Sequence, residues 1–142
     1  MANGHGIETP ANKIATAQAV LSLAFRLNSE VLAGRITPEI FGRDVTIHTG
    51  STGVMLRAFQ EGTDDDLRRG IFNIVLLALG ASALTVDETL DKVFGKATID
   101  TDRNRVGIRI MVNQLRNAFA HNPWRPKWVI YQKYRNCWNM MH

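Results

Sequence analysis

The stretch IFNIVLLALGASALTV, residues 71–86, constrains the fold of this 142-residue chain more than any other segment. From Ile71 to Leu79 it is apolar on nearly every side, as expected for a helix at the centre of a bundle. It is shorter than the roughly 20 residues needed to cross a bilayer, and it contains Asn73. We therefore predict a buried core helix and no membrane partner.

Helix start and stop signals divide the first half of the chain. Thr9 and Pro10 form a start signal for an amphipathic helix that continues to Gly34. Residues 37–39, Thr-Pro-Glu, repeat this signal, but nearby glycines and the β-branched run VTIHTG favour a short helix and a loop. Helical spacing resumes in GVMLRAFQ, residues 53–60.

Two acidic segments indicate further helix starts. Thr63 precedes three aspartates at 64–66, and carboxylates are favourable at the positive end of a helix dipole. A metal site is the alternative, but metal-binding loops need spaced ligands and a turning glycine, so we favour helix capping. The sequence TVDE, residues 85–88, matches a capping box and predicts a new helix that ends at Gly95.

The last predicted helix runs from Arg103 to His121, between the DTD sequence at 100–102 and the Asn-Pro pair at 122–123. At about 100° per residue it has an apolar stripe beside a mostly cationic one. The apolar stripe contains Ile108, Met111, Val112, Leu115 and Phe119, and the cationic stripe contains Arg105, Arg109, Asn113 and Arg116. Val106 and Ile110 form another apolar flank, which we expect a second subunit to cover.

These segments together predict an all-α fold, a helical bundle of four to five helices with a short extended C-terminal arm or hairpin. The arm is expected after Pro126, where aromatic and β-branched residues are frequent. The chain length fits one domain over residues 1–142. Because Cys137 is the only cysteine and the N-terminus lacks the features of a secretory signal, we expect a cytoplasmic protein.

Charge is distributed unevenly along the chain. Residues 1–102 contain nine Lys and Arg against thirteen Asp and Glu, whereas residues 103–142 contain eight basic residues and no acidic one. A positive field over the C-terminal third suits a phosphate-bearing partner, with an affinity that falls as salt rises. A solubilising surface is the alternative interpretation.

Familiar catalytic motifs are missing from the sequence. It has no glycine-rich phosphate loop, no HExxH, no paired-cysteine zinc pattern and no G-x-S-x-G. The four histidines are scattered, so a transition-metal site would need distant ligands to converge, and we expect no metal or cofactor. The remaining candidates are Arg116, Asn117 and His121. Histidine transfers protons near neutral pH and arginine binds phosphate, which together suit phosphodiester transesterification by the 2′-hydroxyl of RNA.

Residues 116–121, RNAFAH, form an R-x4-H motif with asparagine directly after the arginine. The motif ends the last long helix and is followed by NPWRPKW as a helix stop. In these features the chain resembles the HEPN superfamily. The resemblance implies an all-α bundle and a metal-independent endoribonuclease of toxin, antiphage or RNA-processing systems. It also implies a homodimer in which two copies of the motif meet in one cleft.

The resemblance also implies residue roles and products. Arg116 would bind and stabilise the scissile phosphate, Asn117 would orient the site, and His121 would act as general acid or base. Attack by the 2′-hydroxyl would leave 2′,3′-cyclic phosphate and 5′-hydroxyl ends. The residues that we expect to contact RNA or phosphate are Arg105, Arg109, Asn113, Arg125 and Lys127. We expect Trp124 and Trp128 to pack against the core.

A dimer also follows from helix geometry. Five residues rotate a side chain by about 500°, so Arg116 and His121 point about 140° apart within one subunit. A two-fold axis would bring each residue near its twin. The alternatives are a non-catalytic HEPN-fold dimer that binds RNA, nucleotide or a protein partner, and a purely structural helical subunit. An antitoxin partner is left open, and His121 alone could simply complement the negative end of its helix.

Overall fold

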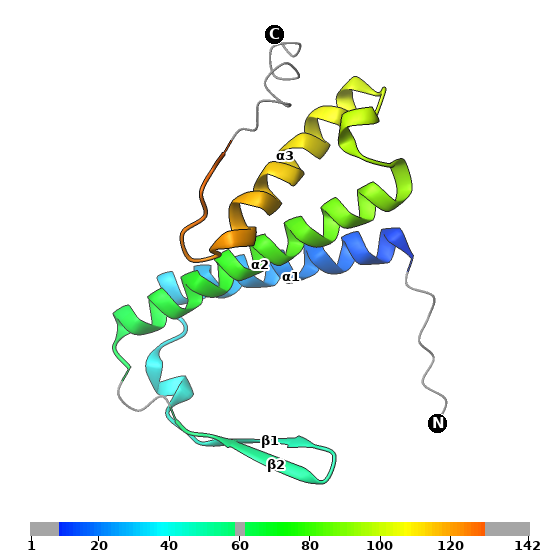
Figure 1. Ribbon diagram of the computed structural model, residues 1–142. Helices are drawn as coiled ribbons and strands as arrows, with labels where there is room; N and C mark the ends of the chain where they lie inside the picture. Colours follow the sequence, from blue (N-terminus) through cyan, green and yellow to red (C-terminus); the bar gives the residue numbers. More distant parts are fainter. Residues whose placement is uncertain (1–8, 59–61, 130–142) are drawn as a thin grey trace. The chain divides into compact units, whose positions relative to one another are not determined.

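The computed structural model describes residues 9–58 and 62–129, and most of them are helical (Figure 1). The elements in chain order are α1 (Pro10–Leu32), the 3-10 helix η1 (Pro38–Phe41), β1 (Val45–Thr49), β2 (Thr52–Leu56), α2 (Asp64–Phe94), the 3-10 helix η2 (Ala97–Ile99) and α3 (Arg103–His121). The described residues therefore contain three α-helices and one two-stranded antiparallel sheet.

The prediction of an all-α bundle of four to five helices is wrong, first because residues 45–56 form a β-hairpin. Its strands pair antiparallel from Val45 with Leu56 to Thr49 with Thr52. Gly50 begins the two-residue turn with a φ of 64°, which suits glycine and fits a type II′ hairpin turn. The signal in the sequence was Gly-Ser between two β-branched runs, which outweighs the helical spacing of residues 53–60.

The prediction is also wrong because α2 is one helix of 31 residues, where two helices were expected. The Thr85 hydroxyl donates to the carbonyl of Ala81 at 2.9 Å, and the Thr89 hydroxyl donates to the carbonyl of Thr85 at 2.6 Å. Threonines inside a helix bond to the preceding turn in this way, whereas a capping residue bonds to the turn that follows. TVDE is therefore not a capping box, and Asp87 lies in the middle of a helix.

Other helix ends are confirmed by their caps. The Thr9 hydroxyl accepts from the backbone N–H of Asn12 at 3.2 Å, which starts α1. Thr63 and Asp66 cap α2 reciprocally, because the Thr63 hydroxyl accepts from the Asp66 N–H while the Asp66 carboxylate accepts from both the N–H and the hydroxyl of Thr63. The Asp102 carboxylate accepts from two N–H groups of the first turn of α3. The predicted bounds of α3 are confirmed.

Contacts divide the chain into two compact units, Met1–Ser22 with Leu76–His142, and Leu23–Val75. The expectation of one domain over residues 1–142 stays a prediction. In the second unit Val31, Leu67 and Ile71 form a buried cluster, against which Leu27 and Ile36 pack. The buried apolar residues of the first unit are mostly small: Ala17, Ala78, Ala83, Ala97, Ile110, Ala118 and Phe119.

In the first unit α3 runs antiparallel to the second half of α2 (Figure 1). Gly80 lies against Phe119, so close that a Cβ at position 80 would be 3.1 Å from the Phe119 Cβ. Two turns further along α2, the Asp87 carboxylate accepts from the Asn113 side chain. Because of this packing, the second half of α2 faces both the R-x4-H motif, at Phe119, and Asn113, which precedes the motif.

The predicted apolar stripe of α3 is partly wrong. Phe119 is buried, but Ile108 and Met111 are 63% and 59% exposed, while Ile110, expected at a subunit interface, is 2% exposed within its own chain. The reason is that α3 has neighbours on more than one side. The chain after it turns back, and the Lys127 N–H donates to the carbonyl of Ala118 at 3.3 Å.

Two other expectations remain open. The predicted C-terminal arm or hairpin lies mainly in residues 130–142, outside the described residues. Helix α2 is long and apolar enough to cross a membrane, with an 18-residue window of mean hydropathy 1.8 that is 33% buried. One such helix is weak evidence because the core helix of a soluble protein passes the same test, so the absence of a membrane partner stays a prediction.

Candidate functional site

The end of α3 is shaped by Asn122, which follows the last helical residue. Its side-chain oxygen accepts from the backbone N–H groups of Trp124 and Arg125 at 3.0 and 3.1 Å. This local turn stops the helix, as the Asn-Pro pair predicted, and directs the chain back along α3. The turn thereby brings the basic residues after it next to the final turn of the helix.

A pocket of about 300 Å³ lies where this returning segment meets the last turn of α3. Its lining residues are Asn117, Ala118, His121, Asn122, Arg125, Lys127 and Val129. Four of the predicted site residues, Asn117, His121, Arg125 and Lys127, thus share one pocket. An imidazole, two cations and amide groups can bind an anion and transfer a proton.

Arg116 is not among the residues that line this pocket. Its guanidinium Nη1 is 3.7 Å from the Asp87 Oδ2, and its side chain is 39% exposed. Its Nε atom is buried and has no hydrogen-bond partner. Within one chain, therefore, Arg116 is held toward α2 and His121 lines the pocket, in agreement with the divergence expected from their five-residue spacing.

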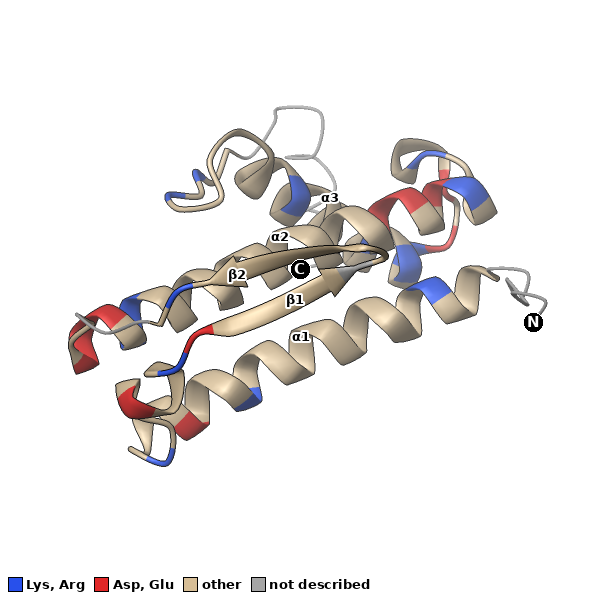
Figure 2. Cartoon of the chain, turned by 90° about the horizontal axis from the view of Figure 1, so that it is seen from below, with Lys and Arg blue, Asp and Glu red and all other residues tan. Residues whose placement is uncertain are grey.

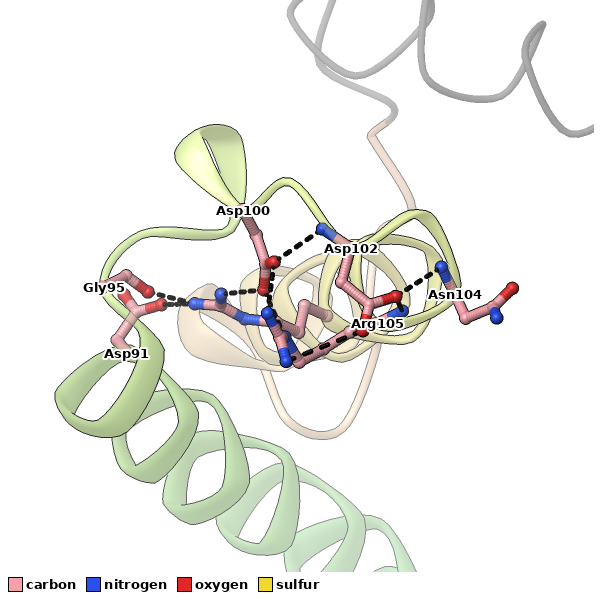
Figure 3. Close-up of polar contacts among 7 residues, drawn as sticks. Asp91, Gly95, Asp100, Asp102, Asn104 and Arg105 are labelled. Atoms are coloured by element: carbon pink, nitrogen blue, oxygen red, sulfur yellow. Dashed lines mark hydrogen bonds and ion pairs between the residues drawn. The ribbon is translucent and has the colours of Figure 1, made fainter.

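Two of the predicted phosphate ligands belong to an internal ion-pair network (Figure 3). The Arg109 side chain is 2% exposed; it donates to Asp100 at 2.7 Å, to Asp91 at 2.9 Å and to the carbonyl of Gly95. Arg105 donates to both oxygens of Asp100 at 2.7 Å and lies 4.3 Å from the centre of the Phe94 ring. We therefore assign Arg109 a structural role and no phosphate contact.

Asp100 is the centre of that network, with a side chain that is 1% exposed. Hydrogen bonds from Arg105 hold the pKa of its carboxyl well below the usual range, and further bonds from Arg109 and the Asp102 N–H act in the same direction against the effect of burial. The same bonds fix the loop between α2 and α3 against the start of α3.

Asn113, another predicted RNA contact, also bonds within the protein. Its side-chain Nδ2 donates to both oxygens of Asp87 at 3.3 and 3.1 Å, and its Oδ1 accepts from the Asn117 Nδ2 at 3.1 Å. Burial raises the pKa of the Asp87 carboxyl, an effect that the hydrogen bond from Asn113 opposes. Asp87 was missed as a site residue because the sequence placed it in a helix cap.

The expected packing of two tryptophans against the core is wrong. The Trp124 and Trp128 side chains follow the turn after α3 and are 52% and 64% exposed. Exposed indoles beside cationic side chains are a common feature of surfaces that bind single-stranded nucleic acid, because bases stack on them. Neither tryptophan lines the pocket, but each is next in the sequence to one of its cations, Arg125 or Lys127.

Fewer cations of the C-terminal third are free of acidic partners than the sequence indicated. Acidic residues of α2 and the following loop lie beside the arginines of α3 (Figure 2). They are Asp87, Asp91, Asp100 and Asp102, and they pair with Arg105, Arg109 and Arg116. Among the described residues of this third, Arg103, Arg125 and Lys127 form no ion pair, and two of the three, Arg125 and Lys127, line the pocket.

The comparisons with known proteins leave the site to be judged on its own geometry. No protein-family model, curated protein or solved structure matches the chain. Among residues 9–58 and 62–129, no three His, Cys, Asp or Glu side chains gather as a metal site would require.

Proposed function

We propose that this chain is a metal-independent endoribonuclease of the HEPN type, a cytoplasmic homodimer that acts as a toxin or antiphage effector. The observation that carries the proposal is the pocket at the end of α3, where His121 and Asn117 meet two unpaired cations, Arg125 and Lys127. The R-x4-H motif supplies the resemblance, and the two exposed tryptophans beside the pocket supply surfaces for unpaired bases.

The proposed reaction uses only groups of the protein and the RNA. A general base takes the proton of the 2′-hydroxyl, the oxygen attacks the adjacent phosphorus, and the bond from phosphorus to the 5′-oxygen breaks. A general acid protonates the leaving 5′-oxygen, which gives 2′,3′-cyclic phosphate and 5′-hydroxyl ends. His121 of one subunit is the proton carrier, and Arg116 of the partner subunit stabilises the charge on the phosphorane.

The experiment is cleavage of single-stranded RNA by purified protein in EDTA. The wild type should produce 2′,3′-cyclic phosphate ends, and His121→Ala should reduce the rate by at least about 100-fold, the usual contribution of a general acid or base. His48→Ala is the matched control, because His48 is exposed on β1 and belongs to no proposed site. The His48→Ala control should cleave at the wild-type rate. If His121→Ala also cleaves at the wild-type rate, His121 has no role in the mechanism.

One observation favours the second candidate, a non-catalytic dimer of the same fold that holds RNA. The Arg116 guanidinium is near Asp87, so part of its charge is already balanced within the chain. If the protein is such a dimer, the cleavage assay should show no product at any protein concentration. A binding measurement should then show RNA affinity that falls as salt rises.

A further inference from the structure

Asp87 is a buried carboxylate that contacts Arg116 of the R-x4-H motif and Asn113 one turn before it. It lies on α2, and its side chain is 8% exposed. Asn113 donates to both of its oxygens, and the Arg116 guanidinium is 3.7 Å from its Oδ2. A buried charge must be satisfied by partners, so this carboxylate restricts the positions of both side chains.

The carboxylate also fixes the orientation of two side-chain amides, those of Asn113 and Asn117. An ionised carboxylate only accepts hydrogen bonds, whereas a carboxamide has one donor end and one acceptor end. Asn113 must therefore turn its Nδ2 toward Asp87, which leaves its Oδ1 to accept from the Nδ2 of Asn117 at 3.1 Å. Asn117 in turn keeps its Oδ1 for another partner.

That remaining oxygen belongs to a residue of the pocket. Asn113, Asn117 and His121 are spaced at i, i+4 and i+8, so they lie along one side of α3. Asn117 and His121 both line the pocket. A phosphate has only acceptors, so an oxygen of Asn117 is suited to a ligand group that donates, and the ribose 2′-hydroxyl is such a group.

We propose that Asp87 is a positioning residue, which through Asn113 orients Asn117 so that its Oδ1 accepts from the 2′-hydroxyl of RNA, and which holds Arg116 by its charge. The statement about RNA rests on the proposed function. The orientation of Asn117 by Asp87 and Asn113 does not depend on that function. The orientation and the contact with RNA can therefore be tested separately.

The first experiment observes the Asn117 side-chain amide by NMR in protein without ligand. Asp87→Asn can offer either end of its carboxamide to Asn113, so the amide resonances of Asn117 should shift or broaden. Asp91→Asn is the matched control, because Asp91 lies one turn further along α2 and pairs with Arg109. Unchanged Asn117 resonances in Asp87→Asn would overturn the relay, whether or not the protein cleaves RNA.

The second experiment measures RNA cleavage and the binding of RNA against DNA of the same sequence. Asp87→Asn and Asn113→Ala should each lower kcat by about ten-fold, as expected for side chains coupled in one network, and should reduce the preference for RNA in binding. Asp91→Asn should change neither. Thermal unfolding of each variant checks that the fold is retained, and Asn113→Ala tests the relay even if Asp87→Asn does not fold.

A double-mutant cycle separates positioning from a general structural effect. If Asp87 acts through Asn117, Asp87→Asn should change the RNA preference very little in an Asn117→Ala background, because the oriented group is already missing. Additive effects of the two substitutions would contradict the proposal. An intact relay in the NMR experiment, together with no cleavage, would contradict the proposed function alone.

Discussion

At the scale of single residues, the arginines on α3 and just after it have different roles. Arg109 is buried in ion pairs, while Arg125, just after the helix, lines the pocket without an acidic partner among the described residues. The sequence could not separate them, because Asp91 and Asp100, the partners of Arg109, come from other elements. Counting charges identified the basic region, and only the contacts identify which charges a ligand can reach.

Replacing Arg109 should destabilise the protein. Arg109→Met leaves the buried carboxylate of Asp100 with fewer partners, and breaking a buried pair from one side typically lowers the free energy of unfolding by about 3 kcal/mol. Urea unfolding followed by circular dichroism measures the loss. Arg103→Met, at the exposed first residue of α3, should have little effect. Equal stabilities of the two variants would show that the network contributes nothing.

The lowered pKa of Asp100 predicts a pH dependence of stability. The carboxyl in the unfolded chain takes up its proton near pH 4, whereas hydrogen bonds from Arg105, then from Arg109 and the Asp102 N–H, keep it ionised in the folded protein at lower pH. Its contribution to stability is therefore complete above that range and is lost as the pH falls below it. In Asp100→Asn the free energy of unfolding should fall less steeply between about pH 5 and 2. If the free energy of unfolding falls equally steeply with pH in Asp100→Asn and in the wild type, Asp100 does not cause this pH dependence.

At the scale of elements, local signals predicted helix ends and failed where tertiary contacts decide. The starts of α1, α2 and α3 were predictable because their caps are formed by neighbouring residues. The hairpin and the unbroken α2 were missed because two local patterns, the helical spacing of residues 53–60 and the capping-box match at Thr85, each fit a second structure. Asn117 and His121 could be named together from the sequence because their motif is local to α3, and both line one pocket; their action on RNA stays a prediction. Asp87 could not be named, because it meets Asn113 from 26 residues away.

The contact between α2 and α3 can be tested by comparing two glycines of α2, Gly80 inside the contact and Gly70 outside it. Alanine at an exposed helical glycine raises helix propensity, so Gly70→Ala, whose Cβ would meet nothing within 4 Å, should stabilise the protein by about 1 kcal/mol. Gly80→Ala should lose that gain or destabilise, because its Cβ would be 3.1 Å from the Phe119 Cβ, an atom fixed to the backbone of α3. Thermal unfolding compares them. An equal gain from both substitutions would mean that the helices are not so closely packed.

At the scale of the whole molecule, the proposal requires a second copy of the chain. Ile108 and Met111 expose apolar side chains on α3, where a partner could cover them. Met111→Lys should therefore shift the protein from dimer to monomer in analytical ultracentrifugation and reduce RNA cleavage with it. The exposed Asn104, substituted by Lys, is the control on the same helix. A Met111→Lys protein that remains dimeric would place the interface elsewhere.

The central claim is that Arg116 and His121 from two copies act on one phosphodiester, because within one chain only His121 lines the pocket. Mixing subunits tests it most directly. Arg116→Ala and His121→Ala proteins should each be inactive, and a mixture allowed to exchange subunits should regain RNA cleavage, since each mixed dimer retains one intact arginine and one intact histidine. A mixture that forms mixed dimers and remains as inactive as its components would contradict the claim.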